Sequence, residues 1–238
     1  MSGELVIECV AFSPHPDDAE LFCGGFLLMA KKAGLRTAVV DLTAGELSTN
    51  GNPQLRAEES ARAAGILGLD ERRNLNIPDG NLANTFENRL KIIDVVRELQ
   101  PGVCLIPYWI DRHPDHEAAS RLVRDALFSS GLKKIESDQK EYRPEKNIYY
   151  MLHTPFEPDF VLDISEVFGE KMKAIQSYAS QFTSDAAHSE RTYINRGDFL
   201  ESIEIRARYY GYLSGCRYAE PFHSQELLKL NNILPIFA

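Results

Sequence analysis

The residues best suited to chemistry lie in two short stretches, each of which follows an apolar run. They read His15-Pro16-Asp17-Asp18, after residues 5–12, and His113-Pro114-Asp115-His116, after residues 103–106. Catalytic zinc takes three nitrogen or oxygen ligands from the protein and leaves a position for water. His15 and Asp18 are three positions apart, close enough to hold one ion. The sequence therefore predicts a metal site that a histidine of the second stretch completes.

The other residues of these stretches have the chemistry of acid–base catalysis. Asp17 could act as general base toward a water whose pKa a metal lowers to about 7. Of His113 and His116, one would complete the ligand set and the other could stabilise a developing oxyanion. Asp115 could hold the imidazole of that second histidine in one protonation state. The pattern is typical of metal-assisted hydrolysis.

The elements that must position these residues alternate along the first half of the chain. Apolar runs lie at 5–12, 37–43, 73–77 and 103–106, with helical patterns at about 19–33, 53–67, 86–99 and 119–131 between and after them. This alternation predicts a Rossmann-like, doubly wound α/β fold with a mostly parallel sheet and helices on both faces. In that fold the first and fourth strands lie side by side, and ligands bind beyond their carboxyl ends. The two stretches follow these two strands.

Each stretch alone also has a purely structural interpretation. Asp17 or Asp18 could cap the following helix, and His113 and His116 could be surface residues at another helix start. Two such stretches at strands expected to be neighbours favour the metal site. A dinucleotide-binding loop is disfavoured, because Gly24-Gly25 comes too late after the first run.

The second half of the chain is less regular. We expect strands at 147–152 and 160–162, a helix capped by Ser165 that extends to about Tyr178, and another helix at about 199–213. Residues 180–198 are polar and aperiodic and predict a surface loop or lid. A tail with several prolines follows. We predict one domain, residues 1–238, with a Rossmann-like core at 1–130 and an elaboration at 131–238 that carries the lid and oligomer contacts.

Composition excludes several classes of partner. The net charge of −9 and the lack of a basic cluster argue against nucleic acid and anionic membranes. The longest apolar runs have about eight residues and are too short to span a bilayer, and the N-terminus lacks the pattern of a signal peptide. The four cysteines form no Cys-x-x-Cys pair, and two lie in apolar runs. These features predict a cytoplasmic protein.

Several segments resemble the LmbE/PIG-L family of zinc-dependent N-acetylglucosamine deacetylases. The strongest are residues 11–20 and 112–116, and the similarity extends over nearly the whole chain. Softer segments are residues 41–48, 128–131, 158–165, 178–182 and 218–220, which are closest to the bacillithiol branch. Ser13-Pro14 departs from the small residues that the family more often has before the first histidine. The resemblance implies an LmbE-like deacetylase fold and removal of acetate from N-acetylglucosaminyl malate.

The resemblance also implies a role for individual residues. It makes His15, Asp18 and His116 the metal ligands and Asp17 the general base that later protonates the leaving amine. It makes His113 the oxyanion-stabilising group in its protonated form, with Asp115 as its partner. The expected cofactor is Zn²⁺, with Fe²⁺ possible because two histidines and an aspartate suit both ions. A homo-oligomer, a hexamer by resemblance, is also implied.

Three further residues are candidates for substrate binding, each with a structural alternative. Arg56 matches a family arginine that contacts the sugar, Arg112 could meet a substrate carboxylate bidentately, and Glu46 could contact substrate or brace its loop. Tyr108 and Trp109 could wall the sugar site or only pack.

Five residues outside the motifs have weaker signals. We interpret His153, His188 and His223 as ordinary loop histidines, because none has ligand spacing. Gln181 and Tyr178 resemble family positions and could serve substrate binding or oligomer contacts.

The preferred hypothesis is a hydrolase that removes the N-acetyl group of an N-acetylglucosamine conjugate. A small-molecule conjugate, rather than nucleic acid or a membrane, is the expected partner. One alternative is a deacylase of another conjugate, such as a mycothiol-type glycoside or an S-conjugate amide. The other is a non-catalytic protein that binds sugar or metal on the same fold.

Overall fold

The computed structural model describes residues 7–182 and 190–229 of the 238-residue chain. In these residues seven strands form one sheet in the order β3-β2-β1-β4-β5-β7-β6. Strands β1 (Cys9–Ser13), β2 (Thr37–Asp41), β3 (Glu71–Asn74), β4 (Val103–Pro107) and β5 (Lys146–Tyr150) run parallel to one another. The predicted mostly parallel, doubly wound sheet is confirmed, and β1 lies beside β4 as expected.

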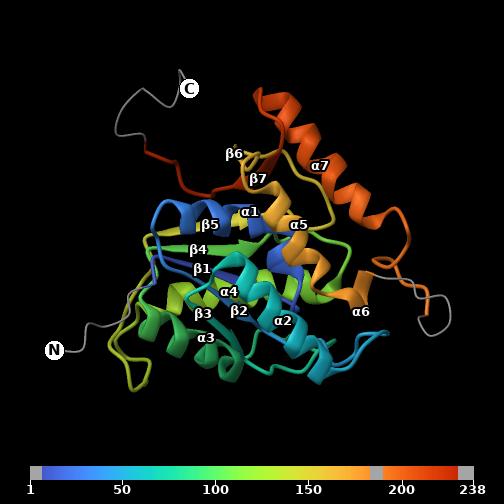
Figure 1. The fold of residues 1–238 in the computed structure, drawn as a ribbon. Coiled ribbons are helices and arrows are strands. Elements are labelled where there is room, and N and C mark those ends of the chain that lie inside the picture. Colours follow the sequence, from blue (N-terminus) through green and yellow to red (C-terminus); the bar gives the residue numbers. More distant parts are fainter. Residues whose placement is uncertain (1–6, 183–189, 230–238) are drawn as a thin grey trace.

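Helices cover both faces of this sheet (Figure 1). On one face α3 (Phe86–Leu99) and α4 (Pro114–Ser130) pack together over a core that includes Val10, Ile93 and Ile106. On the other face lie α1 (Asp18–Lys32), α2 (Pro53–Leu67), α5 (Phe168–Gln176), α6 (Ala179–Phe182) and α7 (Phe199–Ser214). Strands such as β1 and β2 are buried throughout because they are covered from both sides, which explains their continuous apolar runs.

The antiparallel edge of the sheet differs from the sequence-based expectation. Strand β7 (Ala219–His223) falls where we expected a tail, and it lies between β5 and β6 (Phe160–Asp163), antiparallel to both. Proline is normally confined to sheet edges and strand ends because it lacks an N–H. Pro221 within β7 therefore made the segment look unlike a strand, although it pairs in register with Val161.

Two other expectations about the second half were wrong. Helix α5 begins at Phe168, and Ser165 instead contacts the Asp163 carboxylate and the backbone N–H groups of Arg217 and Tyr218. The short helix α6 also occupies the start of the segment expected to be a loop or lid. Residues 183–189 of that segment lie outside the described residues, so the lid stays a prediction.

A buried carboxylate from β7 anchors α1, the helix that carries Asp18. The helix is kinked at Cys23, and its second part begins with Gly24 and Gly25. Glu220 accepts the backbone N–H groups of Gly25 and Phe26 over 2.8 and 2.7 Å and pairs with Lys171 at 2.7 Å. A Cβ at Gly25 would lie only 2.8 Å from Glu220 Oε1, so the close approach requires glycine.

None of the described helices is long and apolar enough to cross a membrane.

Candidate active site

The site lies at the carboxyl ends of β1 and β4, where the doubly wound fold places ligands. These strands pair through Cys9–Val103, Val10–Cys104 and Ala11–Leu105, so their ends reach the same edge of the sheet. A pocket of about 320 Å³ opens there. Its lining includes His15, Asp17, Asp18, Arg56, Arg112, His113 and His116. The structure thus brings the two histidine stretches together, along with two of the three predicted substrate-binding residues.

One oxygen of Asp18 lies between two imidazole nitrogens from different strand ends. Asp18 Oδ2 is 3.1 Å from His15 Nδ1 and 3.3 Å from His116 Nε2. Two ligands at about 2.05 Å from a tetrahedral metal ion lie about 3.3 Å apart. The three side chains therefore have the spacing that a shared ion requires, and they could hold one.

In each of these histidines, the ring nitrogen that does not face Asp18 contacts another carboxylate. His15 Nε2 lies 3.1 Å from Asp79 Oδ1 and 3.4 Å from Asp115 Oδ2, and His116 Nδ1 lies 2.9 Å from Asp111 Oδ1. Metal-ligating histidines commonly donate the ring N–H away from the metal to a carboxylate, which fixes the tautomer and the ring orientation. The donor set here has that arrangement on both rings, so it fits a metal centre.

The electrostatics of the metal-free triad also indicate a cation site. Burial raises the pKa of Asp18, but His116 and His15 outweigh it and hold that pKa well below its usual value. Burial lowers the pKa of His116, but Asp18 and Asp111 outweigh it and raise that pKa to about 9. The pKa of His15 is likewise raised, against burial, by Asp115, Asp18 and Asp79. Without a metal, bound protons supply the positive charge that the buried Asp18 requires.

Two overlapping groups of side chains are less suited to a metal. In the group Asp111, His116 and His153, the fully buried Asp111 carboxylate is already occupied. It accepts the backbone N–H groups of His113, His153 and Thr154 as well as His116 Nδ1. In the group His15, His113 and Asp115, Asp115 Oδ2 accepts the N–H of Gly80 over 2.7 Å. These carboxylates orient neighbouring groups and have little capacity left for an ion.

Asp17 occupies a strained position at the start of α1. Its φ of 132° is rarely adopted by a residue with a side chain, and its side chain does not cap the helix. Ser13 Oγ instead accepts the N–H of Ala19. Arg56, 2% exposed, donates to Asp17 Oδ2 over 3.2 Å and to the carbonyl of Pro16. Burial raises the pKa of Asp17 to about 7 although Arg56 lowers it, a value suited to a general base near neutral pH.

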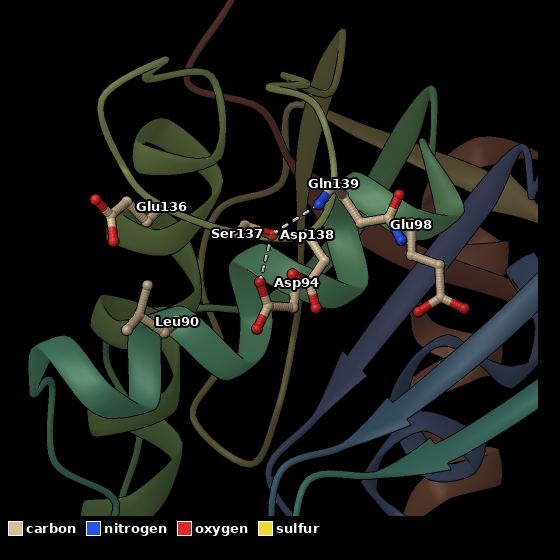
Figure 2. Close-up of a pocket in the computed structure, with 7 residues that line it drawn as sticks. All are labelled: Leu90, Asp94, Glu98, Glu136, Ser137, Asp138 and Gln139. Carbon is tan, nitrogen blue, oxygen red and sulfur yellow. Dashed lines mark hydrogen bonds between the residues drawn. The ribbon is translucent and has the colours of Figure 1, made fainter.

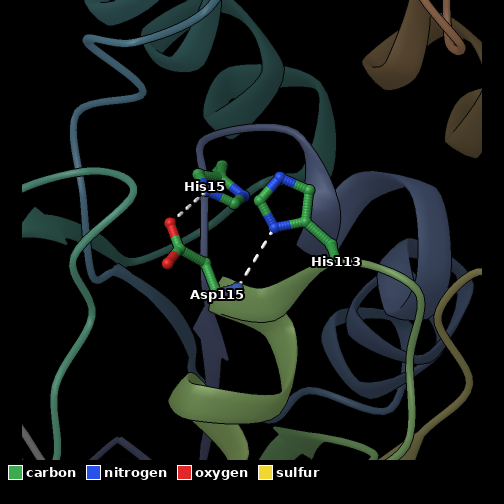
Figure 3. Close-up of side chains that lie close together, drawn as sticks. All are labelled: His15, His113 and Asp115. Atoms are coloured by element: carbon green, nitrogen blue, oxygen red, sulfur yellow. Dashed lines mark hydrogen bonds and ion pairs between the residues drawn. The ribbon is translucent and has the colours of Figure 1, made fainter.

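His113 and Asp115 meet in a different way from that expected. The backbone N–H of Asp115 donates to His113 Nδ1 over 3.2 Å, while the Asp115 carboxylate contacts His15 Nε2 (Figure 3). A ring whose Nδ1 accepts a hydrogen bond carries its proton on Nε2. Burial and the nearby His116 and His15 lower the pKa of His113. The expectation that the Asp115 carboxylate holds the His113 ring was therefore wrong, and the geometry favours a neutral His113 with an Nε2–H donor.

The predicted substrate-binding residues differ in their surroundings. Arg112 is exposed at the pocket, with its guanidinium carbon 3.9 Å from the centre of the Tyr193 ring. Glu46 accepts the N–H of Asp79 over 2.8 Å and is not among the residues that line the pocket, which favours the bracing role. Tyr108 and Trp109 stack on each other at 4.0 Å and pack against the α3–α4 side of the core, so they have the packing role.

Sequence reasoning missed three residues of the site. Asp111 and Asp79 contact the rings of His116 and His15, and His153 lines the pocket instead of being an ordinary loop residue. Asp111 had a usable signal, because it is an acidic residue two positions before His113. Asp79 and His153, which follow β3 and β5, had no such signal in the sequence.

The remaining weaker candidates differ in whether they lie at the pocket. His223 pairs with Asp159 at 2.8 Å, away from the pocket, and His188 lies outside the described residues. Gln181 lines the pocket and donates to the carbonyl of Asn50. The Tyr178 hydroxyl donates to the buried Glu20 over 3.1 Å.

A second hollow on α3 does not resemble a catalytic site. It is lined by Leu90, Asp94, Glu98, Glu136, Ser137, Asp138 and Gln139 (Figure 2). Figure 2 shows the carboxylates of Glu98 and Glu136 at opposite sides of the hollow, and Glu98 pairs with Arg73. Asp94 accepts the hydroxyl of Ser137. Glu98 and Asp94 thus already have partners on the protein.

Comparison of the sequence with known proteins identifies related deacetylases. The PIG-L family model, described as GlcNAc-PI de-N-acetylase, matches residues 10–127, which include both histidine stretches. A diacetylchitobiose deacetylase of Thermococcus kodakarensis is 32% identical over 230 residues, covering 90% of this chain and 82% of that protein. The chain belongs to the PIG-L family. The family resemblance seen in the sequence is thus confirmed.

Two further relatives extend the comparison. A probable N-acetyl-α-D-glucosaminyl L-malate deacetylase 2 of Bacillus anthracis is 27% identical, covering 76% of this chain and 84% of that protein. The crystal structure of a conserved protein from Thermus thermophilus is 40% identical in sequence and superposes with a TM-score of 0.86. It covers 95% of this chain and 98% of that one. The similarity to known structures therefore includes nearly all of the fold.

Proposed function

We propose that this chain is a metal-dependent hydrolase that removes the N-acetyl group from an N-acetylglucosamine conjugate, with N-acetylglucosaminyl malate as the substrate. The observation that carries the proposal is the convergence of His15 Nδ1 and His116 Nε2 on Asp18 Oδ2 within 3.3 Å. The buried Asp17 carboxylate lines the same pocket. Membership in the PIG-L family and the relatives named for N-deacetylation support the same reaction.

In this proposal each residue of the pocket has a defined task. His15, Asp18 and His116 would hold Zn²⁺, or Fe²⁺, and a bound ion supplies Lewis-acid chemistry toward the amide carbonyl and water. Asp17 takes a proton from the attacking water and returns it to nitrogen as the C–N bond breaks, so acetate and a free amine leave. The Nε2–H of His113 donates to the carbonyl oxygen as its negative charge develops. Asp115, Asp79 and Asp111 keep the three rings in place.

The surroundings of Arg112 support an acidic aglycone. This exposed side chain lines the pocket, and among the described residues it contacts the Tyr193 ring rather than a carboxylate. A guanidinium binds a carboxylate through two parallel hydrogen bonds, which malate could supply. The similarity to the Thermococcus kodakarensis enzyme favours diacetylchitobiose as the second candidate, and a mycothiol-type or S-conjugate amide is the third.

The proposal is tested by measuring acetate release from a panel of substrates, with metal content determined on the same sample. The panel contains N-acetylglucosaminyl malate, diacetylchitobiose and a neutral alkyl N-acetylglucosaminide. We expect malate to be preferred, and Arg112→Ala to lower kcat/KM for the malate conjugate about tenfold or more while leaving diacetylchitobiose unaffected, because a charge-assisted bidentate pair is lost. Preference for diacetylchitobiose would replace the proposed substrate.

A catalytic variant separates an enzyme from a binding protein. Asp17→Asn is expected to retain the metal and lose about 10²- to 10⁴-fold in turnover. If the metal-loaded wild type releases no acetate from any conjugate, the chain is instead a non-catalytic sugar- or metal-binding protein.

We also propose a cytoplasmic homo-oligomer. Exposed apolar side chains gather on α7 at Ile205, Tyr209, Tyr212 and Leu213, which supports association between chains. All four cysteines are free, and Cys9, Cys23 and Cys104 are buried, which fits a reducing compartment. Light scattering of the purified protein would show a mass above 26.8 kDa, and a monomer would contradict the assembly.

A further inference from the structure

The pocket has an apolar corner that the proposed reaction does not yet use. Leu21, Ile194 and the ring of His153 all line the pocket. Leu21 and Ile194 belong to the core on the α1 side, Leu21 as a buried member and Ile194 as a half-buried one. His153 packs edge-on against Phe22, with the ring centres 5.1 Å apart. A polar sugar would find few hydrogen-bond partners here.

This corner is adjacent to the metal-ligand residues. Leu21 follows Asp18 by three positions, so the two lie on the same side of α1. The backbone N–H of Leu21 also donates to the Asp17 carbonyl over 2.9 Å. The ring of His153 is stacked on that of His116, with centres 5.5 Å apart and planes at 12°. The Tyr193 ring lies perpendicular to the His153 ring with its centre 5.4 Å away, and Tyr193 directly precedes Ile194 in the chain.

The order of strands decides which part of a substrate points into the corner. Leu47, Ser48, Thr49 and Arg56 follow β2 and line one side of the pocket, whereas His153 follows β5. In the sheet, β2 and β5 flank the β1–β4 pair, so these residues enter the site from opposite sides. Neighbouring strands are about 4.8 Å apart, which separates β2 from β5 by about 14 Å.

The reacting amide must lie between these two sides. Its nitrogen has to reach Asp17, which Arg56 holds from the β2 side. The nitrogen also carries the sugar, and a sugar that extends toward β2 would place its hydroxyl groups near Ser48, Thr49 and Arg56, which line that side of the pocket. In that orientation the substituent on the carbonyl carbon would point the other way, toward β5.

We propose that Leu21, His153 and Ile194 form the acyl-binding corner of this site and that its size selects acetyl over longer acyl groups. The inference rests on the proposed function and specifies the acyl part of its substrate. Two hydrogen bonds hold the segment that carries Ile194. The Asn50 side chain accepts the N–H of Glu190 and donates to the carbonyl of Glu190. The Asn195 side chain, directly after Ile194, also donates to the Glu190 carbonyl, so the segment is tied on both sides of Ile194.

The test uses glucosamine conjugates that differ only in the acyl group: acetyl, propionyl and butyryl. Hydrolysis breaks the same C–N bond in each, and the liberated amine is measured by the same fluorogenic reaction. We expect the wild type to prefer acetyl over butyryl by about tenfold or more in kcat/KM, since one methylene in a fitted pocket changes rates by about 10- to 200-fold. Ile194→Ala is expected to raise the butyryl-to-acetyl ratio by about tenfold.

Two other variants keep this test decisive. Leu47→Ala shortens an apolar side chain on the β2 side and should leave the butyryl-to-acetyl ratio unchanged. Leu21→Val removes a single methylene and should raise the propionyl-to-acetyl ratio, which provides a second measurement if Ile194→Ala does not fold. A ratio that is unchanged in Ile194→Ala and Leu21→Val, or shifted as much by Leu47→Ala, overturns the acyl-binding corner alone. No amine released from the acetyl conjugate by the wild type overturns the proposed function as well.

Discussion

Arg56 donates to Asp17 across 3.2 Å between two elements that are far apart in sequence, the α2 helix and the β1–α1 turn. Both side chains are at least nine-tenths buried, so little water screens the pair. The pairing keeps a buried carboxylate ionisable, since burial raises the pKa of Asp17 and the guanidinium opposes that rise. Arg56 therefore acts on the predicted base directly, apart from any contact with a bound sugar.

Replacing Arg56 should shift the pH profile of the reaction. Without the guanidinium the pKa of Asp17 rises, so more of the base is protonated at neutral pH. We expect Arg56→Met to move the acidic limb of kcat/KM upward by about one pH unit or more, with about tenfold lower activity at neutral pH and partial recovery at higher pH. A profile that keeps its acidic limb while KM rises would assign Arg56 to sugar binding alone.

Removing the carboxylate behind His116 should weaken metal binding. Asp111 Oδ1 lies 2.9 Å from His116 Nδ1, and such supporting carboxylates are typically worth about 10- to 100-fold in metal affinity. We expect Asp111→Asn to lose Zn²⁺ affinity in that range, measured by competition with a chelator. Asp138→Asn, which removes the same charge from an exposed position on the α3 hollow, is the matched control. Equal affinities for the two variants would refute the supporting role.

Metal binding should release protons and become tighter as pH rises. The pKa of His116 is raised to about 9 in the metal-free protein, so at about pH 7.5 this ring is protonated and must lose its proton to bind a metal. Calorimetric titration in buffers of different ionisation enthalpy would give the number of protons released. Binding enthalpies that do not depend on the buffer would contradict the prediction.

The same raised pKa predicts how stability depends on pH. A histidine with a folded pKa of about 9 and an ordinary value of 6.5 stabilises the fold fully below pH 6.5, and this contribution is lost as pH rises through 9. The melting temperature of the metal-free protein should therefore fall between pH 6.5 and 9. The metal-loaded protein should change less, because the ion replaces the protons. Parallel curves for the two forms would count against the proton-for-metal exchange.

The buried pair under α1 should matter more for stability than a surface pair. Lys171 and Glu220 are each 3% exposed and lie 2.7 Å apart. We expect Lys171→Met to lower the free energy of unfolding by about 3 kcal/mol, because it leaves a buried carboxylate without its cation. Lys32→Met, which breaks the exposed pair with Glu166, should cost less than about 1 kcal/mol. Urea denaturation measures both, and similar losses would argue against the anchoring role of Glu220.

Much of this protein could be predicted from local patterns. Continuous apolar runs such as β1 and β4 alternate with periodic helices, and that pattern is specific for a covered parallel sheet. The neighbouring positions of β1 and β4 follow from the usual winding of such sheets, which is why His15 could be paired with the stretch at 113–116 from the sequence. The choice of His116 over His113 came only from the family resemblance. The antiparallel β7 could not be found in this way, since its position between β5 and β6 depends on partners distant in sequence. Pro221 also makes the segment unlike a typical strand.

The amino-acid sequence by itself determined which reactive groups are present, and histidines and aspartates at fixed spacing after two strands favour a metal site. Only the tertiary structure decided what each group contacts. Loops after β3, β4 and β5 bring Asp79, Asp111 and His153 to the site, and the backbone at Asp115 sets the tautomer of His113. Hydrogen bonds and burial act over a few ångströms between residues that are distant in sequence, such as His15 and Asp115, and this proximity is created by the packing of the whole sheet.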